Sequence, residues 1–198
     1  MKQLKENAAT QRIAIFASGR GSNASKIIDY FEENSSVEVS VILTNRKDAK
    51  VLDLAQKHHI PQLITNKTEF YHSDKIIKDL ARYNVDLIVL AGFLWLIPSY
   101  LVESYPDKIL NIHPALLPKY GGKGMYGMNV HNAVHKAGEN ETGITIHYVN
   151  ERYDDGAILF QAACKVEKTD TAQQIAEKVL ALEHQHLPSV IEQLLRKD

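Results

Sequence analysis

The sequence has few of the features that mark secreted, membrane-spanning or polyanion-binding proteins. Its single cysteine, Cys164, cannot form an intrachain disulfide, and the N-terminal stretch MKQLKENAATQ lacks the apolar core of a secretory signal. No run approaches the roughly 18 apolar residues that span a membrane. The formal net charge of −1 argues against a broad nucleic-acid surface. We therefore expect a cytoplasmic protein with no nucleic-acid or membrane partner.

The remaining composition fits one globular domain. The 198 residues are 44% hydrophobic and 24% charged, which is an ordinary balance, and domains cluster near roughly 100–200 residues. We expect a single domain over residues 1–198, in which residues 1–11 form a flexible polar leader.

Apolar runs that predict strands alternate with amphipathic segments that predict helices along the first half of the chain. Strands are expected at 12–17, 37–45, 61–65, 85–93 and 108–113. Helices are expected at 26–33, 48–59 and 73–84. This alternation predicts an α/β fold with a mostly parallel, twisted, Rossmann-like sheet and helices on both of its faces.

The second half of the chain changes in character. A Gly-rich loop at 114–127 precedes a predicted helix at 129–138. Two alternating segments, 142–151 and 156–167, predict an antiparallel C-terminal addition to the sheet. A final helix is expected from about Thr171, kinked or broken at Pro188.

The first predicted strand runs into the glycine-rich segment GRGSNA, residues 19–24, which precedes a helix. Its spacing fits the G-x-G-x-x-G/A fingerprint of dinucleotide-binding loops, but about 20 residues later Arg46 stands in place of the expected acid, although Arg46 suits a 2′-phosphate. The simpler interpretation is a phosphate monoester held at the helix N-terminus by backbone N–H groups and two side chains of Gly21, Ser22 and Asn23. A tight turn capped by Ser22 or Asn23 is the alternative without a ligand.

The stretch LNIHPALLP, residues 110–118, places two polar side chains at the end of an apolar strand. Asn111 and His113 are two positions apart, so both project from one face of the strand. An amide donor beside a protonatable imidazole suits an oxyanion that develops during acyl transfer. Pro114 and Pro118 keep the following chain out of a helix, and Pro118 is a candidate for a cis peptide bond. For His113 the alternative is a hydrogen-bonded, partly buried structural histidine.

A catalytic histidine needs a carboxylate that orients its ring, and the candidates are Asp154 and Asp155 in NERYDDGAILFQ. This acidic pair joins two predicted strands, so a plain turn is the alternative. Ligands in open α/β sheets bind outside the carboxyl ends of the strands. We therefore expect one site where four loops converge, namely those after Ala17, Asn45, Leu90 and His113.

Three further features bear on metal binding, covalent catalysis and the binding of a flat ring. His131 and His135 lie four apart on a predicted helix, yet no third ligand accompanies them, so no metal is expected. Cys164 lies within a predicted strand and is expected in the core, and no serine occupies a G-x-S-x-G nucleophile motif. The segment GFLWLIP, residues 92–98, is either part of a short helix or an apolar slot whose backbone groups suit a flat heteroaromatic ring.

The whole pattern resembles the phosphoribosylglycinamide formyltransferase family of folate-dependent enzymes. The segments that carry the resemblance are IAIFASGRGSNASKII, DLIVLAGFLWLIP, ILNIHPALLPKYGG and ETGITIHYVNERYDDGAILFQ. It extends from about Arg12 to Leu195, and NIHPALLPKY and DDGAILFQ are shared with the wider formyltransferase superfamily. The resemblance implies a formyltransferase fold and the transfer of a formyl group from 10-formyltetrahydrofolate to the amine of 5-phosphoribosylglycinamide, a step of purine biosynthesis.

The resemblance also implies roles for residues by their position in the motifs. The implied catalytic residues are Asn111, His113 and Asp154. The implied phosphate-binding residues are Gly21, Ser22 and Asn23, and the ribose hydroxyls fall to Glu183. The implied folate-binding residues, acting largely through backbone groups, are Leu94, Trp95, Leu96 and Ile97, together with Asn111. The family implies small-molecule substrates, no metal, and a monomer or homodimer.

Two features depart from the family pattern. Trp95 stands where many members carry Arg, a change that recognition of the pterin through backbone groups should tolerate. The loop GGKGMYGMNV, residues 121–130, is longer than in the commoner forms, which leaves the cleft rim and the role of His131 open. Two alternatives from other classes are an NADP-binding protein, which rests on GRGSNA and Arg46, and a phosphate-ligand sensor, which has no use for the predicted catalytic residues.

Overall fold

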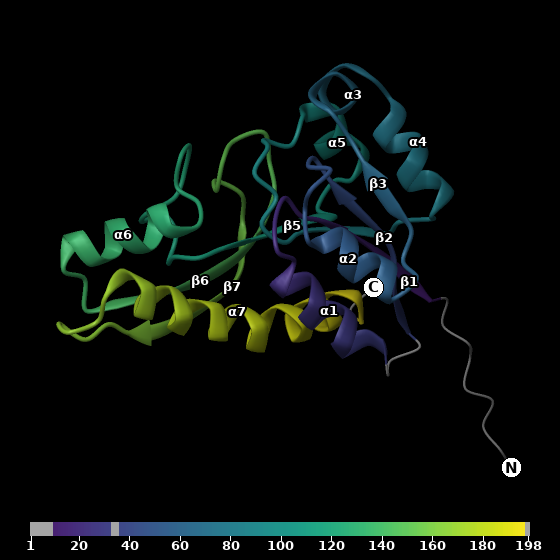
Figure 1. Ribbon diagram of the computed structural model, residues 1–198. Coiled ribbons are helices and arrows are strands. Elements are labelled where there is room, and N and C mark those ends of the chain that lie inside the picture. Colours follow the sequence, from purple (N-terminus) through teal and green to yellow (C-terminus); the bar gives the residue numbers. More distant parts are fainter. Residues whose placement is uncertain (1–9, 33–35, 197–198) are drawn as a thin grey trace, which may run out of the picture.

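Seven strands form one sheet in the order β3-β2-β1-β4-β5-β6-β7 (Figure 1). The structure is a computed structural model that describes residues 10–32 and 36–196. The strands are β1 Gln11–Phe16, β2 Val37–Thr44, β3 Gln62–Ile64, β4 Leu87–Leu90, β5 Ile109–His113, β6 Glu141–Tyr148 and β7 Ile158–Lys165. All neighbours from β3 to β5 are parallel, whereas β6 and β7 add antiparallel. The predicted α/β fold with its antiparallel addition is confirmed.

Helices cover both faces of this sheet. On one face lie α1 Ser22–Glu32, α2 Val51–Lys57 and the long α7 Ala172–Leu195. On the other face lie α3 Lys67–His72, α4 Lys75–Arg82 and α5 Ser99–Ser104. α6, Met128–Ala137, packs against α7, which runs beside α1 and along β6 and β7 (Figure 1). Among the residues that the structure describes, no helix is long and apolar enough to cross a membrane.

The central strand β1 shows why this sequence needs two helical layers. Ile13 and Ile15 are fully buried in the core beneath α1, α2 and α7. Ala14 and Phe16 are fully buried in the opposite core, beneath α3, α4 and α5. Successive side chains of a strand point to opposite faces, so an uninterrupted apolar strand buries all its side chains only when both faces are covered.

The predicted segment boundaries differ from the structure at two short helices and at the leader. α3 and α5 were not predicted, because six-residue helices show little periodicity, although Asn66 caps α3 by accepting a hydrogen bond from the Glu69 N–H at 3.0 Å. The predicted leader, residues 1–11, lies outside the described residues up to residue 9, and Gln11 already belongs to β1.

The structure also decides between two alternatives for residues 92–98 and tests the prediction for the last helix. Residues 92–98 form no helix: Gly92 has a φ of +78°, and the Leu94 N–H donates to the hydroxyl of Ser18 at 3.0 Å. α7 runs as one helix through Pro188, so of the two predicted outcomes, a kink or a break, the break is wrong. The cost of a proline inside a helix, about 3 kcal/mol, is offset where Leu187, Val190 and Ile191 bury the helix on the core.

The strand order places the site. β1 and β4 are neighbours, but the chain leaves β1 toward β2 on one side and continues from β4 toward β5 on the other. Such a switch point opens a crevice at the carboxyl ends of the two strands. The loops that follow β1 and β4 meet there, since the Ser18 N–H donates to the carbonyl of Gly92 at 3.0 Å.

Candidate active site

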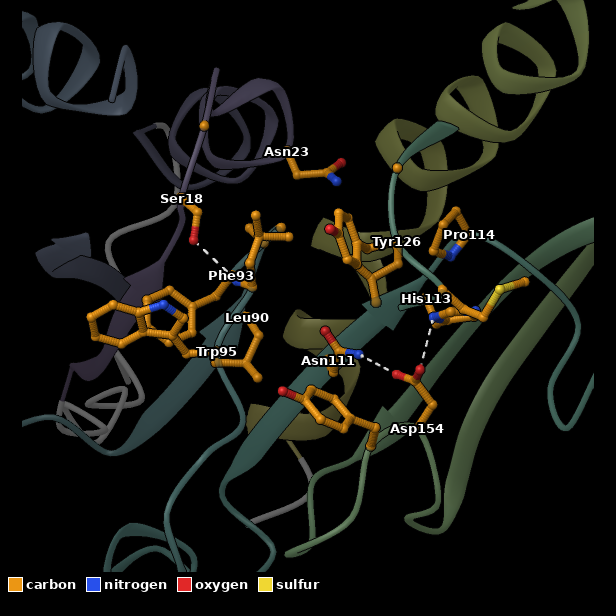
Figure 2. Close-up of a pocket in the computed structure, with 18 of the residues that line it drawn as sticks. Ser18, Asn23, Leu90, Phe93, Trp95, Asn111, His113, Pro114, Tyr126 and Asp154 are labelled. Atoms are coloured by element: carbon orange, nitrogen blue, oxygen red, sulfur yellow. Dashed lines mark hydrogen bonds and ion pairs between the residues drawn. The ribbon is translucent and has the colours of Figure 1, made fainter. Parts of the chain in front are cut away.

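One large pocket, about 870 Å³ in volume, lies at this crevice. The loops expected to converge after Ala17, Asn45, Leu90 and His113 all contribute to its lining. The remaining lining comes from the turn after β6, the loop that precedes α6, and residues of α6 and α7. Figure 2 shows side chains from separate parts of the chain around this space, among them Asn23, Asn111 and Asp154. The predicted convergence of loops is confirmed.

At one end of the pocket the segment 18–23, here named the phosphate loop, leads from β1 into α1. Gly21 has a φ of +76°, and a Cβ added to it would lie 2.8 Å from Cγ2 of Val51. Glycine is therefore required at this position by its backbone conformation and by its packing. The helix begins at Ser22, so the N–H groups of its first turn have no intrahelical acceptor and face the anion-favouring end of the helix dipole.

The two residues that follow Gly21 use their side chains differently. Ser22 is exposed. Asn23 is only 8% exposed, and its side-chain amide donates to Oε2 of Glu183 on α7 at 2.7 Å. The predicted side-chain donor of Asn23 is therefore directed at a carboxylate and not at the open end of the loop. Burial raises the pKa of Glu183, and the hydrogen bond from Asn23 and the charge of His113 oppose that rise.

At the centre of the pocket β5 delivers Asn111 and His113 on one face, as its period requires, while Ile112 packs in the core beneath α7. Both side chains meet Asp154 (Figure 2). The Asn111 amide lies 3.3 Å from Oδ1 of Asp154, and Nδ1 of His113 lies 3.4 Å from its Oδ2. Of the two candidate acids only Asp154 joins this group, since the exposed Asp155 pairs with Arg152 at 2.9 Å.

The chain beyond His113 is held by the neighbouring strand. Thr145, opposite His113 in the β5–β6 register, donates to the carbonyl of Ala115 at 2.7 Å and accepts from the Leu117 N–H at 2.9 Å. The peptide bond between Leu117 and Pro118 is cis, as the sequence suggested it could be.

The backbone around Asp154 fixes its carboxylate. Asp154 has a φ of +53°, and a Cβ on Gly156 would lie 1.7 Å from the carbonyl oxygen of Tyr148, so the turn requires glycine there. Oδ2 of Asp154 accepts the Gly122 N–H at 2.8 Å. Burial raises the pKa of Asp154, but the imidazoles of His113 and His147 and the Gly122 N–H outweigh burial, so the pKa lies well below its ordinary value. Asp154 is an anion at neutral pH.

Both ring nitrogens of His113 face hydrogen-bond acceptors. Nε2 lies 2.8 Å from the carbonyl oxygen of Tyr120, while Nδ1 faces the Asp154 carboxylate. A neutral imidazole has one N–H and one acceptor nitrogen, so only the doubly protonated ring satisfies both partners. With His113 only 3% exposed, the geometry favours a positive charge beside Asn111, which suits a developing oxyanion.

His147 on β6 is a fourth member of this group that the sequence analysis missed. It is 2% exposed and lies opposite Asn111 in the strand register. Its Nδ1 lies 2.8 Å from the Tyr148 carbonyl oxygen, and its Nε2 lies 3.1 Å from the Asn111 amide nitrogen and 3.7 Å from Oδ1 of Asp154. We name Asn111, His113, His147 and Asp154 the reaction cluster. The alternation of ITIHYV gave a signal for His147, but the register did not follow from the sequence.

Residues 94–97 form a further wall of the pocket, which begins beside the phosphate loop because the Leu94 N–H donates to the Ser18 hydroxyl. Trp95 is half-buried among aromatic rings, with centroids 5.4 Å from Phe70, 5.9 Å from Tyr71 and 6.1 Å from Phe93. The N–H groups of Trp95, Leu96 and Ile97 make no hydrogen bond within the described part of the chain. This arrangement favours the apolar slot with available backbone groups over the short helix.

Comparison with known proteins gives the family. Residues 11–191 match the formyl transferase family. The chain belongs to this family. It is 43% identical over 187 residues to a chloroplastic phosphoribosylglycinamide formyltransferase of Arabidopsis thaliana, an alignment that covers 91% of this chain and 64% of that protein. It is 38% identical over 192 residues to the Bacillus subtilis phosphoribosylglycinamide formyltransferase, with coverages of 93% and 95%. The resemblance seen in the sequence is confirmed.

Solved structures of the same family agree. A glycinamide ribonucleotide transformylase from Symbiobacterium toebii superposes with a TM-score of 0.89 at 30% identity, covering 99% of this chain and 92% of that one. The chain spans less than two thirds of the length of the plant relatives that it matches. The formyltransferase fold expected from the sequence is thus confirmed.

Other residues singled out in the sequence fall at different distances from the formyl transferase site. His131 lines the pocket, and burial together with the charge of His113 lowers its pKa. His135, on the same helix, is exposed. Arg46 also lines the pocket but pairs with Asp48 at 2.9 Å, which weakens the case for a 2′-phosphate contact. Cys164 lies on β7, packed partly against the core as expected.

The loop GGKGMYGMNV, residues 121–130, lines the pocket from residue 122 to residue 128. In Figure 2 Tyr126 lies between Asn23 and Pro114, over the space that separates the phosphate loop from the reaction cluster. The Tyr126 side chain is 52% exposed. The loop is joined to the reaction cluster by the Gly122 N–H and the Tyr120 carbonyl.

Proposed function

We propose that this chain transfers the formyl group of 10-formyltetrahydrofolate to the amine of 5-phosphoribosylglycinamide. The observation that carries the proposal is the reaction cluster, in which the Asn111 amide and the His113 imidazole each lie within 3.4 Å of the Asp154 carboxylate. This cluster shares one pocket with the phosphate loop and the apolar wall of residues 94–97. The family supports a folate-derived formyl donor and a small-molecule acceptor.

The acceptor enters through the phosphate loop. Its phosphate binds the N–H groups at the start of α1, in the segment of Gly21, Ser22 and Asn23, where the helix dipole favours an anion. Its ribose hydroxyls bind Glu183, which lines the same pocket. The glycinamide amine then reaches toward His113.

The donor binds along residues 94–97. The pterin binds the backbone groups that make no hydrogen bond within the described chain, on a wall built by Leu94, Trp95, Leu96 and Ile97. Leu94 is 44% exposed, so its side chain presents apolar surface to a flat ring, whereas Ile97 is buried. Asn111, between this wall and His113, contacts the formyl group of the donor.

The distances within the reaction cluster separate fixed contacts from replaceable ones. The contacts that orient the ring of His113 and the carboxylate of Asp154, to Tyr120 and Gly122, measure 2.8 Å. The contacts of Asn111 and His113 with Asp154 measure 3.3 and 3.4 Å, which is long for a hydrogen bond. An incoming oxygen can therefore take these two donors without disturbing the orientation of the cluster.

The reaction follows from that arrangement. The substrate amine attacks the formyl carbon, a C–N bond forms, and the carbonyl oxygen becomes an oxyanion. The Asn111 amide and the Nδ1–H of protonated His113 stabilise that oxyanion. Asp154 stabilises the charge of His113 and, through water, moves the amine proton to the departing folate nitrogen as the bond from that nitrogen to the formyl carbon breaks.

An absorbance assay with 10-formyl-5,8-dideazafolate and phosphoribosylglycinamide tests the proposal. We expect deformylation that requires the acceptor and that falls by about 10²–10⁴-fold in His113→Ala. The matched control is His135→Ala, an exposed histidine whose replacement should leave the rate unchanged. Deformylation that is independent of the acceptor would indicate a hydrolase, and no deformylation by the folded protein would contradict the proposal.

Donor binding can be followed without turnover. Trp95 is the only tryptophan of the chain and belongs to the proposed donor wall. We expect the dideazafolate to change the intrinsic fluorescence, and inorganic phosphate alone to leave it unchanged. If the dideazafolate does not change the fluorescence, the folate binds away from Trp95. The cytoplasmic location, the absence of a metal and the monomeric or dimeric state stay predictions.

A further inference from the structure

The phosphate loop and α7 are joined by one buried contact. Asn23 and Glu183 are 160 residues apart in the chain, yet the Asn23 amide donates to Oε2 of Glu183 at 2.7 Å. The two side chains are 8% and 9% exposed, and both residues line the pocket. In Figure 2 the Asn23 side chain points across the top of the pocket.

Neither residue of this pair uses all its hydrogen-bonding atoms within the described part of the chain. Within the described part of the chain, Asn23 is the only group that donates to the Glu183 carboxylate. The Asn23 amide oxygen is buried and has no partner among the described residues. A buried carboxylate ordinarily takes more than one donor, since an unsatisfied buried acceptor is costly. One oxygen of Glu183 thus stays available to a ligand in the pocket.

The orientation of the amide is determined by charge. If the Asn23 amide were turned over, its oxygen would face the Glu183 carboxylate, and two acceptors would lie at hydrogen-bond distance. The observed orientation directs one of the two N–H groups of the amide at Glu183. The contact with the carboxylate therefore fixes which way the Asn23 side chain is turned.

We infer that Asn23 is a positioning residue for sugar recognition: its amide holds one oxygen of Glu183 so that the other oxygen accepts from the vicinal hydroxyls of a ribose. The inference rests on the proposed function and goes beyond it, because it gives the phosphate loop a second role. The backbone of the loop binds the phosphate, and the Asn23 side chain sets the preference for ribose over deoxyribose. Binding of the two parts of the acceptor is thereby coupled.

Kinetics with phosphoribosylglycinamide and its 2′-deoxyribosyl analogue test the inference. The wild type should favour the ribosyl acceptor by about a hundredfold or more in kcat/KM, since a hydroxyl-binding site rejects an analogue without the hydroxyl. In Asn23→Ala the KM for the ribosyl acceptor should rise about tenfold. The KM for the deoxy analogue, the KM for the folate and the kcat should change little, so the ribose preference falls.

Two further variants separate positioning from packing. Ser22→Ala, in the same turn of α1, should change the KM for both acceptors by the same factor, because the phosphate is common to them. The exchanged pair Asn23→Asp with Glu183→Gln keeps one amide and one carboxylate in contact. It should recover the thermal stability lost in Asn23→Ala. It should not recover the ribose preference, because the carboxylate then lies on α1 and no longer on α7.

Each outcome decides the inference. If Asn23→Ala raises the KM for both acceptors equally and weakens inhibition by inorganic phosphate, the side chain binds phosphate and the inference is wrong. If the exchanged pair restores the ribose preference, the contact is merely structural. A wild type that transfers formyl without preferring ribose refutes the ribose role of Glu183, and a wild type that transfers no formyl refutes the proposed function itself.

Discussion

The phosphate loop and the reaction cluster lie in one pocket but hold their functional groups by different means. In the phosphate loop the groups are backbone N–H groups, fixed by the positive φ of Gly21 and by the start of α1. In the reaction cluster they are side chains of β5, β6 and the following turn, fixed by hydrogen bonds to one another and to backbone. The phosphate loop should therefore be sensitive to an added Cβ, and the reaction cluster to a removed side chain.

After His113→Ala, the largest effect is expected from Asn111→Ala. Removing one oxyanion donor should lower kcat by about 10²–10³-fold, or roughly 2.7–4 kcal/mol, while the KM for the phosphate-bearing acceptor stays nearly unchanged. Steady-state kinetics with both substrates varied measures this split. Asn132→Ala, an exposed residue of α6, is the matched control. An equal loss of binding and turnover would show that the reaction cluster also anchors the substrate.

Gly21→Ala tests the phosphate loop in the same assay. The added Cβ would meet Cγ2 of Val51 at 2.8 Å in a left-handed backbone, so we expect about 1–3 kcal/mol of lost stability and a higher KM for the acceptor. Of stability, acceptor KM and kcat, the kcat should change least. Gly19→Ala is the control, because a Cβ there meets no atom within 4 Å. If Gly21→Ala and Gly19→Ala lose equal stability and raise the acceptor KM equally, the close contact of position 21 with Val51 is not what makes the phosphate loop sensitive to an added Cβ.

His147→Leu tests whether the reaction cluster depends on members that do not touch substrate. The variant removes the imidazole nitrogen that lies 3.1 Å from the Asn111 amide nitrogen. The loss of one such hydrogen bond, about 1 kcal/mol, should lower kcat about fivefold and leave both KM values close to wild type. An unchanged kcat would mean that Asp154 alone orients Asn111.

The smallest effect is expected in acid stability. Because the pKa of Asp154 lies below its ordinary value, its ionised form stabilises the fold fully above the unfolded pKa, near 3.9. That contribution is lost as the pH falls further. Urea unfolding between pH 5 and pH 2.5 should show a shallower decline for Asp154→Asn than for wild type. The exposed Asp155→Asn should decline like the wild type.

The sequence predicted most of the fold because its signals were local. The alternation of apolar strands with amphipathic helices gave the parallel sheet, and the period of β5 placed Asn111 and His113 on one face. The choice of Asp154 over Asp155 came from the family resemblance, and the geometry supports it. The convergence of four loops followed from the general rule for open sheets.

What the sequence did not yield depends on contacts between distant segments. His147 joins Asn111 only through the register of β5 with β6, and a shift by one residue would have turned it to the other face. The pairing of Asn23 with Glu183 requires α7 to lie along α1. The unbroken course of α7 through Pro188 likewise depends on burial, which overrides the local preference of proline.

The distance in sequence between Asn23 and Glu183 has a consequence for the order in which the site forms. The acceptor end of the pocket is complete only after α7, the last helix of the chain, has docked on α1, whereas residues 94–97 belong to the middle of the chain. Under the proposed function, an acceptor that bridges the phosphate loop and Glu183 binds only the docked state and by mass action opposes undocking. We therefore expect the acceptor to slow amide exchange in α7.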